Sequence, residues 1–122
     1  MRLKTGLIAL AAALLCTGVA NAGTMRVVVV ETSDVAGYVK LLEEGKALLK
    51  KKGSQSELHV WYGRYAGPDV GHVAVTIVYP SLESLAKDDG MMRTDAELSG
   101  WLERVAKIRK IVSDSIYEEL KP

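Results

Sequence analysis

The chain has 122 residues, which suits one small domain, and its formal net charge at neutral pH is +1. This near-neutral charge lacks the basic excess that neutralises phosphates, so nucleic acid is not an expected partner. The single cysteine, Cys16, excludes an internal disulfide and a zinc site built on several thiolates.

The N-terminal segment, residues 1–22, has the pattern of an export signal. Arg2 and Lys4 precede an almost unbroken apolar run over residues 6–19, and the small-residue triplet "ANA" ends at Ala22. The run is shorter than the roughly 18 to 20 residues that cross a bilayer as a helix. We therefore predict cleavage after Ala22, export to the periplasm or the medium, and no stable membrane insertion afterwards.

An uncleaved membrane anchor and a lipidated Cys16 are the alternatives to this cleavage. The flanks of the apolar run are typical of a cleavage signal rather than an anchor. The bulky Leu14 and Leu15 directly before Cys16 argue against lipidation. Cleavage would leave residues 23–122 as a single domain without cysteine, and the loss of two basic residues would take the net charge from +1 to −1.

The first half of this mature chain has the pattern of a strand followed by a helix. Residues 25–31, "MRVVVVE", are almost uninterruptedly β-branched, which is typical of a strand buried on both faces. Residues 32–34, "TSD", offer capping oxygens for a helix that we expect to end at Gly53. Gly45 lies in the apolar stripe of this helix, where it could let the backbone approach the sheet closely. The stripe consists of Val35, Tyr38, Leu41, Leu42, Leu48 and Leu49.

The second half of the mature chain begins with a predicted β-hairpin. Residues 57–65, "ELHVWYGRY", and residues 72–79, "HVAVTIVY", are rich in β-branched and aromatic side chains. Between them, Gly67, Pro68 and Gly71 supply the residue types of a turn. We therefore predict two antiparallel strands that pair through this turn.

Two helical pieces and a last strand are predicted after the hairpin. Ser81 is expected to cap a short helix that the sequence "KDDG", residues 87–90, breaks. Thr94 and Glu97 form a capping-box pattern, so a second helical piece is expected to start there. Residues 110–120 complete the chain as the fourth strand. The apolar stripe of the second helical piece consists of Leu98, Trp101, Leu102, Val105 and Ile108.

The order β-α-β-β-α-β predicts an α+β ferredoxin-like domain, a four-stranded antiparallel sheet with its helices on one face. The first and third strands carry apolar side chains on both sides, so the second face would be left in contact with water. Burying about 500 Å² there is worth on the order of 12 kcal/mol before the costs of association. A homodimer that pairs two sheet faces into an α/β barrel is therefore expected. Val28 and Thr76 are placed on that face, with Val29 and Ile77 as alternatives because a one-residue slip exchanges the two faces.

The strand-to-helix passage resembles a known group of proteins. The sequence "GHVAVTIVYPSLESLAKDDG" followed by "DAELSGWLERV" resembles NIPSNAP-like proteins, and the element order resembles the dimeric α/β-barrel superfamily, which includes antibiotic-biosynthesis-type monooxygenases. The resemblance covers residues 25–122 and implies a homodimer with an apolar cavity between sheet and helices. Members range from cofactor-independent or haem-degrading oxygenases to proteins without established chemistry.

Haem degradation is the activity of this superfamily that the sequence fits least. The resemblance implies an asparagine, a tryptophan and a helix-borne histidine for it. The predicted mature chain has no asparagine, since Asn21 leaves with the signal, and neither His59 nor His72 lies on a predicted helix. Haem is therefore not expected, and no other cofactor is predicted.

The hairpin carries the candidate site residues. His72, Tyr65 and His59 are the weak catalytic candidates, and Trp61, Tyr65 and His72 are the candidates for ligand binding. Alternation places His59, Trp61 and Tyr65 on one face of the second strand. Near the hairpin mouth, Tyr65 or Asp69 could assist His72 as a general base. The alternative is a histidine that is hydrogen-bonded at the start of a strand. His59 lies too far from His72 to share a metal ion, so no metal site is predicted.

The acidic residues around "GMMRT" are interpreted as structural. We expect solvated turn and helix-start charges, favoured by the helix dipole, at Asp88, Asp89, Asp95 and Glu97. Met91 and Met92 could gate a cavity, but packing beneath a loop is the favoured interpretation.

Two hypotheses on function follow. The first is an exported, non-catalytic homodimer that binds a small apolar or aromatic molecule. The second is a cofactor-independent monooxygenase or related small-molecule enzyme, whose histidine and tyrosine tips would have to point into an enclosed pocket. The direction of these side chains discriminates between the two.

Overall fold

The computed structural model describes residues 23–65 and 67–122. The predicted signal segment and its cleavage point before Gly23 lie at and beyond the edge of the described residues. The elements in chain order are β1 (Thr24–Glu31), α2 (Val35–Lys51), β2 (Glu57–Tyr62), the 3₁₀ turn η1 (Gly67–Asp69), β3 (Val73–Tyr79), α3 (Leu82–Thr94), α4 (Ala96–Lys107) and β4 (Lys110–Glu118).

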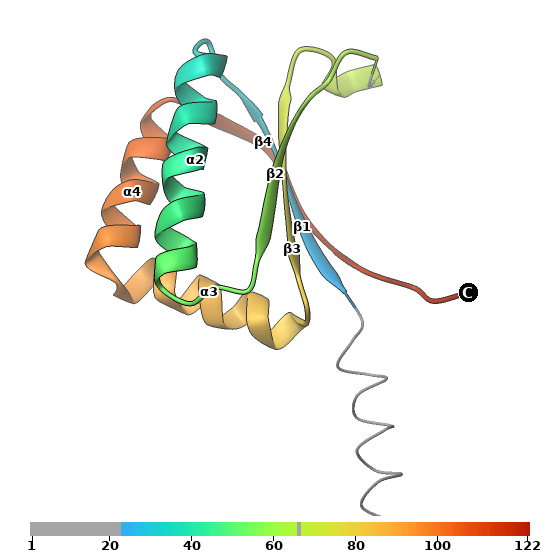
Figure 1. Ribbon diagram of the computed structural model, residues 1–122. Helices are drawn as coiled ribbons and strands as arrows, with labels where there is room; N and C mark the ends of the chain where they lie inside the picture. The colour runs from blue at the N-terminus through green and yellow to red at the C-terminus, as the bar shows by residue number, and fades with distance from the viewer. Residues whose placement is uncertain (1–22, 66) are drawn as a thin grey trace, which may run out of the picture.

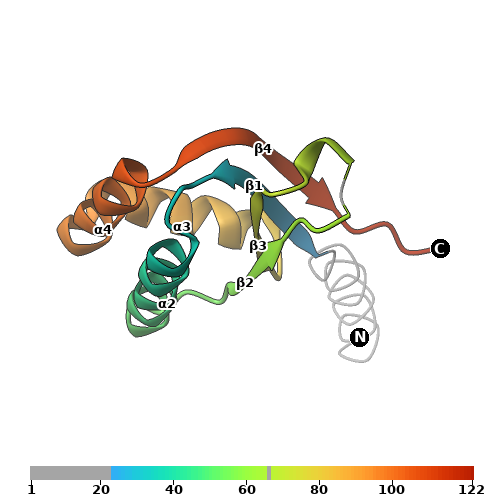
Figure 2. The same cartoon turned by 90° about the horizontal axis from the view of Figure 1, so that it is seen from above.

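The four strands form one antiparallel sheet in the order β2-β3-β1-β4. Helices α2, α3 and α4 lie on one side of this sheet, and no helix of residues 23–65 or 67–122 longer than the 3₁₀ turn η1 lies on its other side (Figure 1). The view from above shows the same separation, with α2 and α4 beside each other and α3 running under the strands (Figure 2). The predicted α+β ferredoxin-like fold is therefore confirmed.

Local signals explain the ends of α2. The Asp34 carboxylate accepts a hydrogen bond of 2.9 Å from the Gly37 amide, which makes Asp34 the N-cap among the three expected candidates. At the other end, Gly53 has a φ of 85°, a left-handed conformation that favours glycine. Lys50 and Lys51 lie in the last turn, where positive charge is favoured.

The prediction that "KDDG" breaks the third helix is wrong. Helix α3 runs without interruption from Leu82 to Thr94. Its polar residues are accommodated because Asp88 is buried and hydrogen-bonded to Ser54, while Asp89 pairs with Arg93 one turn later. The break comes at Asp95, which caps α4 by accepting from the amides of residues 97 and 98 at 3.0 and 3.1 Å. The predicted cap at Thr94 is therefore wrong by one residue.

The hairpin turn is longer than predicted. Strand β2 ends at Tyr62 and β3 starts at Val73, because backbone hydrogen bonds within the segment between them form a turn. The Gly63 amide donates to the His72 carbonyl at 2.9 Å, and the Gly71 amide donates to the Gly63 carbonyl at 2.8 Å. His72 is therefore held at the base of the turn rather than in the strand.

The register of the sheet assigns each strand residue to a face. Val28 pairs with Val75 and Val30 with Val73, and all four belong to the buried core beneath the helices. The alternate residues Val27 and Val29 point to the open face, where Val27 is half-buried and Val29 is buried at 7% exposure. The placement of Val28 on the partner-facing side is wrong, because its side chain packs against the helices.

Thr76 and Ile77 are separated by the same alternation. Ile77 packs against the core and lines the space under the helices. Thr76 accepts a hydrogen bond of 2.8 Å from the indole of Trp61, a side chain that is 57% exposed on the open face. The predicted placement of Thr76 on the open face is thus confirmed.

Trp101 joins the two main helices. Its side chain is buried, and its indole nitrogen donates to the Leu41 carbonyl of α2 at 2.7 Å. A Cβ added to Gly45 would lie 2.0 Å from the Trp101 ring. The close approach expected at Gly45 therefore exists, but it is toward α4 and not toward the sheet.

Candidate functional site

The structure brings His59 and Trp61 together on the open face of the sheet. Their ring centroids lie 6.2 Å apart, and the His59 Nε2 atom lies 2.8 Å from a carboxylate oxygen of Glu57. Both side chains face away from the helices, as the strand alternation requires. Neither residue lines the space between sheet and helices.

Tyr65 and His72 lie near the hairpin turn. Tyr65 is fully exposed. The His72 Nε2 atom is 3.2 Å from a carboxylate oxygen of Glu31, and its Nδ1 atom is 3.6 Å from one of Asp69. The Nδ1 atom is buried and has no hydrogen-bond partner among the described residues. These contacts hold His72 between two acids at the end of the sheet, away from the space under the helices.

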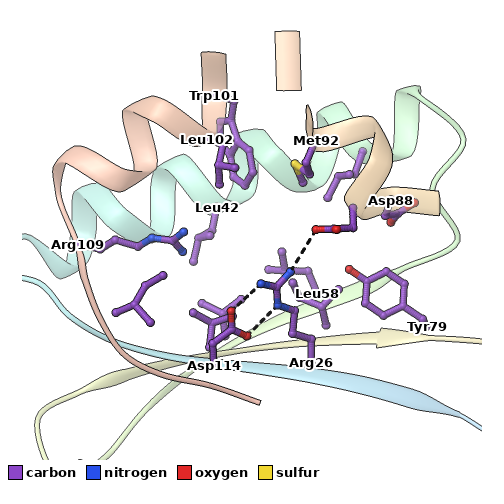
Figure 3. Close-up of a pocket in the computed structure, with 16 residues that line it drawn as sticks. Arg26, Leu42, Leu58, Tyr79, Asp88, Met92, Trp101, Leu102, Arg109 and Asp114 are labelled. Atoms are coloured by element: carbon purple, nitrogen blue, oxygen red, sulfur yellow. Dashed lines mark hydrogen bonds and ion pairs between the residues drawn. The ribbon is translucent and has the colours of Figure 1, made fainter. Parts of the chain in front are cut away.

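A cavity of about 170 Å³ lies between the sheet and the helices. Figure 3 shows Trp101 and Leu102 reaching into it from α4 and Met92 from α3, above Arg26 and Asp114 on the strands. Most of the lining is apolar, and it consists of Val28, Leu42, Leu49, Leu58, Val75, Ile77, Met92, Trp101, Leu102 and Ile111. A concave, mainly apolar space with a few polar groups is the usual form of a small-molecule site.

An ion pair crosses the floor of this cavity. The guanidinium of Arg26 donates to both carboxylate oxygens of Asp114, at 2.9 and 2.6 Å. These hydrogen bonds lower the pKa of Asp114 and raise the pKa of Arg26, so both groups stay charged. Asp89 lies 4.0 Å from the same guanidinium. The positive charge of Arg26 on the cavity floor is therefore offset by the negative charge of Asp114.

One end of the cavity holds a buried phenol and a buried carboxylate. Burial, and then the charge of Asp88, raise the pKa of Tyr79 to about 12. The Tyr79 hydroxyl is thus a neutral hydrogen-bond donor. Asp88 is 2% exposed and accepts a hydrogen bond from the Ser54 hydroxyl. The interpretation of Asp88 as a solvated charge is wrong, because α3 continues through it and places it on the same face as Leu85.

The opposite end of the cavity is marked by Arg109, between α4 and β4. Its guanidinium points into the cavity (Figure 3) and donates to the Tyr38 hydroxyl at 3.3 Å. Arg26, Asp88, Arg109 and Asp114 were not singled out as site residues by the sequence analysis. A charged residue at an inward position of an apolar strand, as at Arg26, was the one signal available.

Met92 packs against the core, as expected, and Met91 is half-buried.

Among the described residues, no group of three or more histidine, cysteine or acidic side chains is placed to hold a metal ion. Within residues 23–65 and 67–122, no helix is long and apolar enough to span a membrane.

Comparison of the chain with known proteins gives matches in structure and not in sequence. No protein-family model and no curated protein matches it. A crystallised NIPSNAP family protein of unknown function from Agrobacterium tumefaciens has a TM-score of 0.63 at 12% identity, covering 81% of this chain and 89% of that one.

Two oxygenase-type structures are also similar. SnoaB, a cofactor-independent oxygenase from Streptomyces nogalater, has a TM-score of 0.63 at 5% identity, covering 82% of this chain and 95% of that one. A putative antibiotic biosynthesis monooxygenase from Bordetella bronchiseptica has a TM-score of 0.57 at 9% identity, covering 83% and 98%. The chain therefore shares its ferredoxin-like fold with NIPSNAP family proteins and antibiotic-biosynthesis-monooxygenase-like proteins.

Proposed function

We propose that the protein binds a small apolar or aromatic molecule in the cavity between sheet and helices, without catalysis. The observation that carries this proposal is the lining of the cavity. Its walls are mainly apolar, Arg26 is balanced by Asp114, and neither His59 nor His72 takes part in the lining. A base that activates a substrate has to reach it within the pocket, and Asp88, the buried carboxylate at the end of the cavity, is held by Ser54.

Filling the cavity is expected to abolish binding. Toluene, at ten times its dissociation constant, should raise the melting temperature of the unmodified protein by roughly 5 °C, because a ligand that binds only the folded state stabilises it. Leu102→Trp places a larger side chain in the cavity and should remove this rise. Glu103→Trp, at the neighbouring exposed position, is the matched control. Equal rises in both variants would place toluene elsewhere.

We propose further that the protein acts as a homodimer through its open sheet face. The support is the apolar character of that face in a sheet covered by helices on one side only (Figure 1). It includes the exposed side chains Trp61, Val78 and Tyr117, with exposures of 57, 38 and 55%. A second copy presents the same surface, so the contact would close on itself by two-fold symmetry.

We also propose export, which rests on the sequence of residues 1–22. Expression in a bacterial host with an active secretion pathway should yield a product that starts at Gly23. Intact mass of the secreted protein measures this directly. A mass that retains residues 1–22, or one that adds lipid to Cys16, would contradict the proposal. Arg2 and Lys4 replaced together by glutamate should reduce the exported fraction, since the positive n-region is part of the signal.

A cofactor-independent oxygenase is the second candidate function. The fold shared with SnoaB favours it, and Tyr79 and Trp101 give the cavity an aromatic wall. Asp88 is the buried carboxylate that would serve as base. The test is oxygen uptake in the presence of a small phenol. Uptake faster than the uncatalysed rate in the unmodified protein, and its loss in Asp88→Asn, would show that the cavity catalyses a reaction and does not only bind.

A further inference from the structure

We infer that the ligand of the cavity is a small carboxylate with a single apolar ring or a body of similar size, and that Arg109 binds its carboxylate. This inference rests on the proposed binding function and adds the chemical class of the ligand. It starts from Arg109, which, unlike the other arginine of the cavity, Arg26, forms no ion pair with an acid of residues 23–65 or 67–122.

Arg109 has unused hydrogen-bonding capacity. Its guanidinium carries five N–H donors, and within the described part of the chain it donates one side-chain hydrogen bond, to the Tyr38 hydroxyl at 3.3 Å. No carboxylate of residues 23–65 or 67–122 lies within 4.0 Å of it. Arg26 and Arg104, in contrast, each pair with both oxygens of an acid. A half-buried cation without such a partner favours an anion beside it.

The acids of the cavity do not serve as that anion. Asp114 feels the charge of Arg109, but hydrogen bonds from Arg26 are the main cause of its lowered pKa and occupy both of its oxygens. Asp89 pairs with Arg93. In Figure 3, Asp88 lies at the far end of the cavity from Arg109, with Leu42 between them. A ligand carboxylate at Arg109 is therefore kept apart from the negative charge of Asp88.

The shape and size of the cavity define the rest of the ligand. Between Arg109 and Asp88 the walls are the apolar side chains of Leu42, Trp101 and Leu102 (Figure 3). An apolar cavity of about 150 Å³ binds benzene in another protein, so a space of about 170 Å³ suits one ring with a small substituent. A guanidinium matches the two oxygens of a carboxylate in a bidentate geometry. Benzoate has this combination of charge and size.

The test compares three probes of nearly equal shape: benzoate, benzyl alcohol and toluene, titrated at neutral pH by calorimetry. Benzoate is expected to bind the unmodified protein about tenfold more tightly than benzyl alcohol, since a hydrogen bond to a charged group is stronger than a neutral one. Arg109→Met should remove this preference and leave the binding of toluene within about twofold. Arg109→Lys, which keeps the charge but loses the planar fork, should keep part of it. Arg64→Met, at an exposed position outside the cavity lining, should leave it intact.

Two results would overturn the inference while leaving cavity binding in place. The first is equal affinity of the unmodified protein for benzoate and benzyl alcohol. The second is a preference for benzoate that survives Arg109→Met and disappears in Arg26→Met. If the unmodified protein binds none of the three probes, the proposed function fails together with the inference. The probe series on the unmodified protein decides the matter even if Arg109→Met does not fold.

Discussion

Thr76→Lys is expected to give a folded monomer, whereas Ile77→Lys is expected to unfold the chain. The two residues are neighbours on β3, but their side chains lie on opposite faces of the sheet. A lysine at position 76 would place an unpaired ammonium in the proposed dimer interface, which costs several kcal/mol in association. A lysine at position 77 would place the ammonium in the core under the helices. There, the loss of the apolar contacts of Ile77 adds to the cost of burying the charge.

The measurements are the mass in solution by light scattering at micromolar concentration and the unfolding transition by circular dichroism. Thr76→Lys should halve the mass and retain a cooperative transition. Ile77→Lys should lose that transition. The pair Val27→Lys and Val28→Lys repeats the comparison on β1, with the half-buried Val27 beside Thr76 on the open face and Val28 in the core. A stable monomer for the unmodified protein would contradict the dimer outright.

The order of elements could be predicted because each one carries its own local signal. These signals depend on only a few residues each, and all of them are found in the structure: the β-branched run of β1, the helix caps at Asp34 and Ser81, and the left-handed glycine at position 53. The face of each strand could not be predicted. Alternation gives two equivalent assignments, and the position of the helices, set by distant contacts such as Trp101 with Leu41, decides between them.

The cavity was hidden from the sequence for a related reason. Arg26 and Asp114 lie 88 residues apart and meet because β1 and β4 are neighbours in the sheet. Asp88 looked like a residue of a loop, since a run of two acids and a glycine is a common helix breaker. Its burial depends on Ser54, which follows α2. The candidates visible in the sequence were on the hairpin, and they lie outside the cavity lining: His59, Trp61, Tyr65 and His72.

Gly45→Ala is expected to destabilise the protein by about 1 to 3 kcal/mol, although alanine is the better helix former by about 1 kcal/mol. The added methyl group would lie 2.0 Å from Cζ2 and 2.4 Å from Cε2 of Trp101, far inside the contact distance of carbon atoms. The ring is buried at 4% exposure and cannot swing into solvent without opening the core. Moving it would also weaken the 2.7 Å hydrogen bond from its indole to Leu41.

Gly100→Ala is the matched control, because it makes the same change in α4 at a position with no heavy atom within 4 Å of the new methyl group. It should stabilise the protein by up to about 1 kcal/mol through helix propensity alone. Urea unfolding of both variants then gives free-energy changes of opposite sign. Shifts of the same sign and size would mean that α2 and α4 separate easily at Gly45. In that case the packing of Trp101 would not be what holds the cavity between sheet and helices in shape.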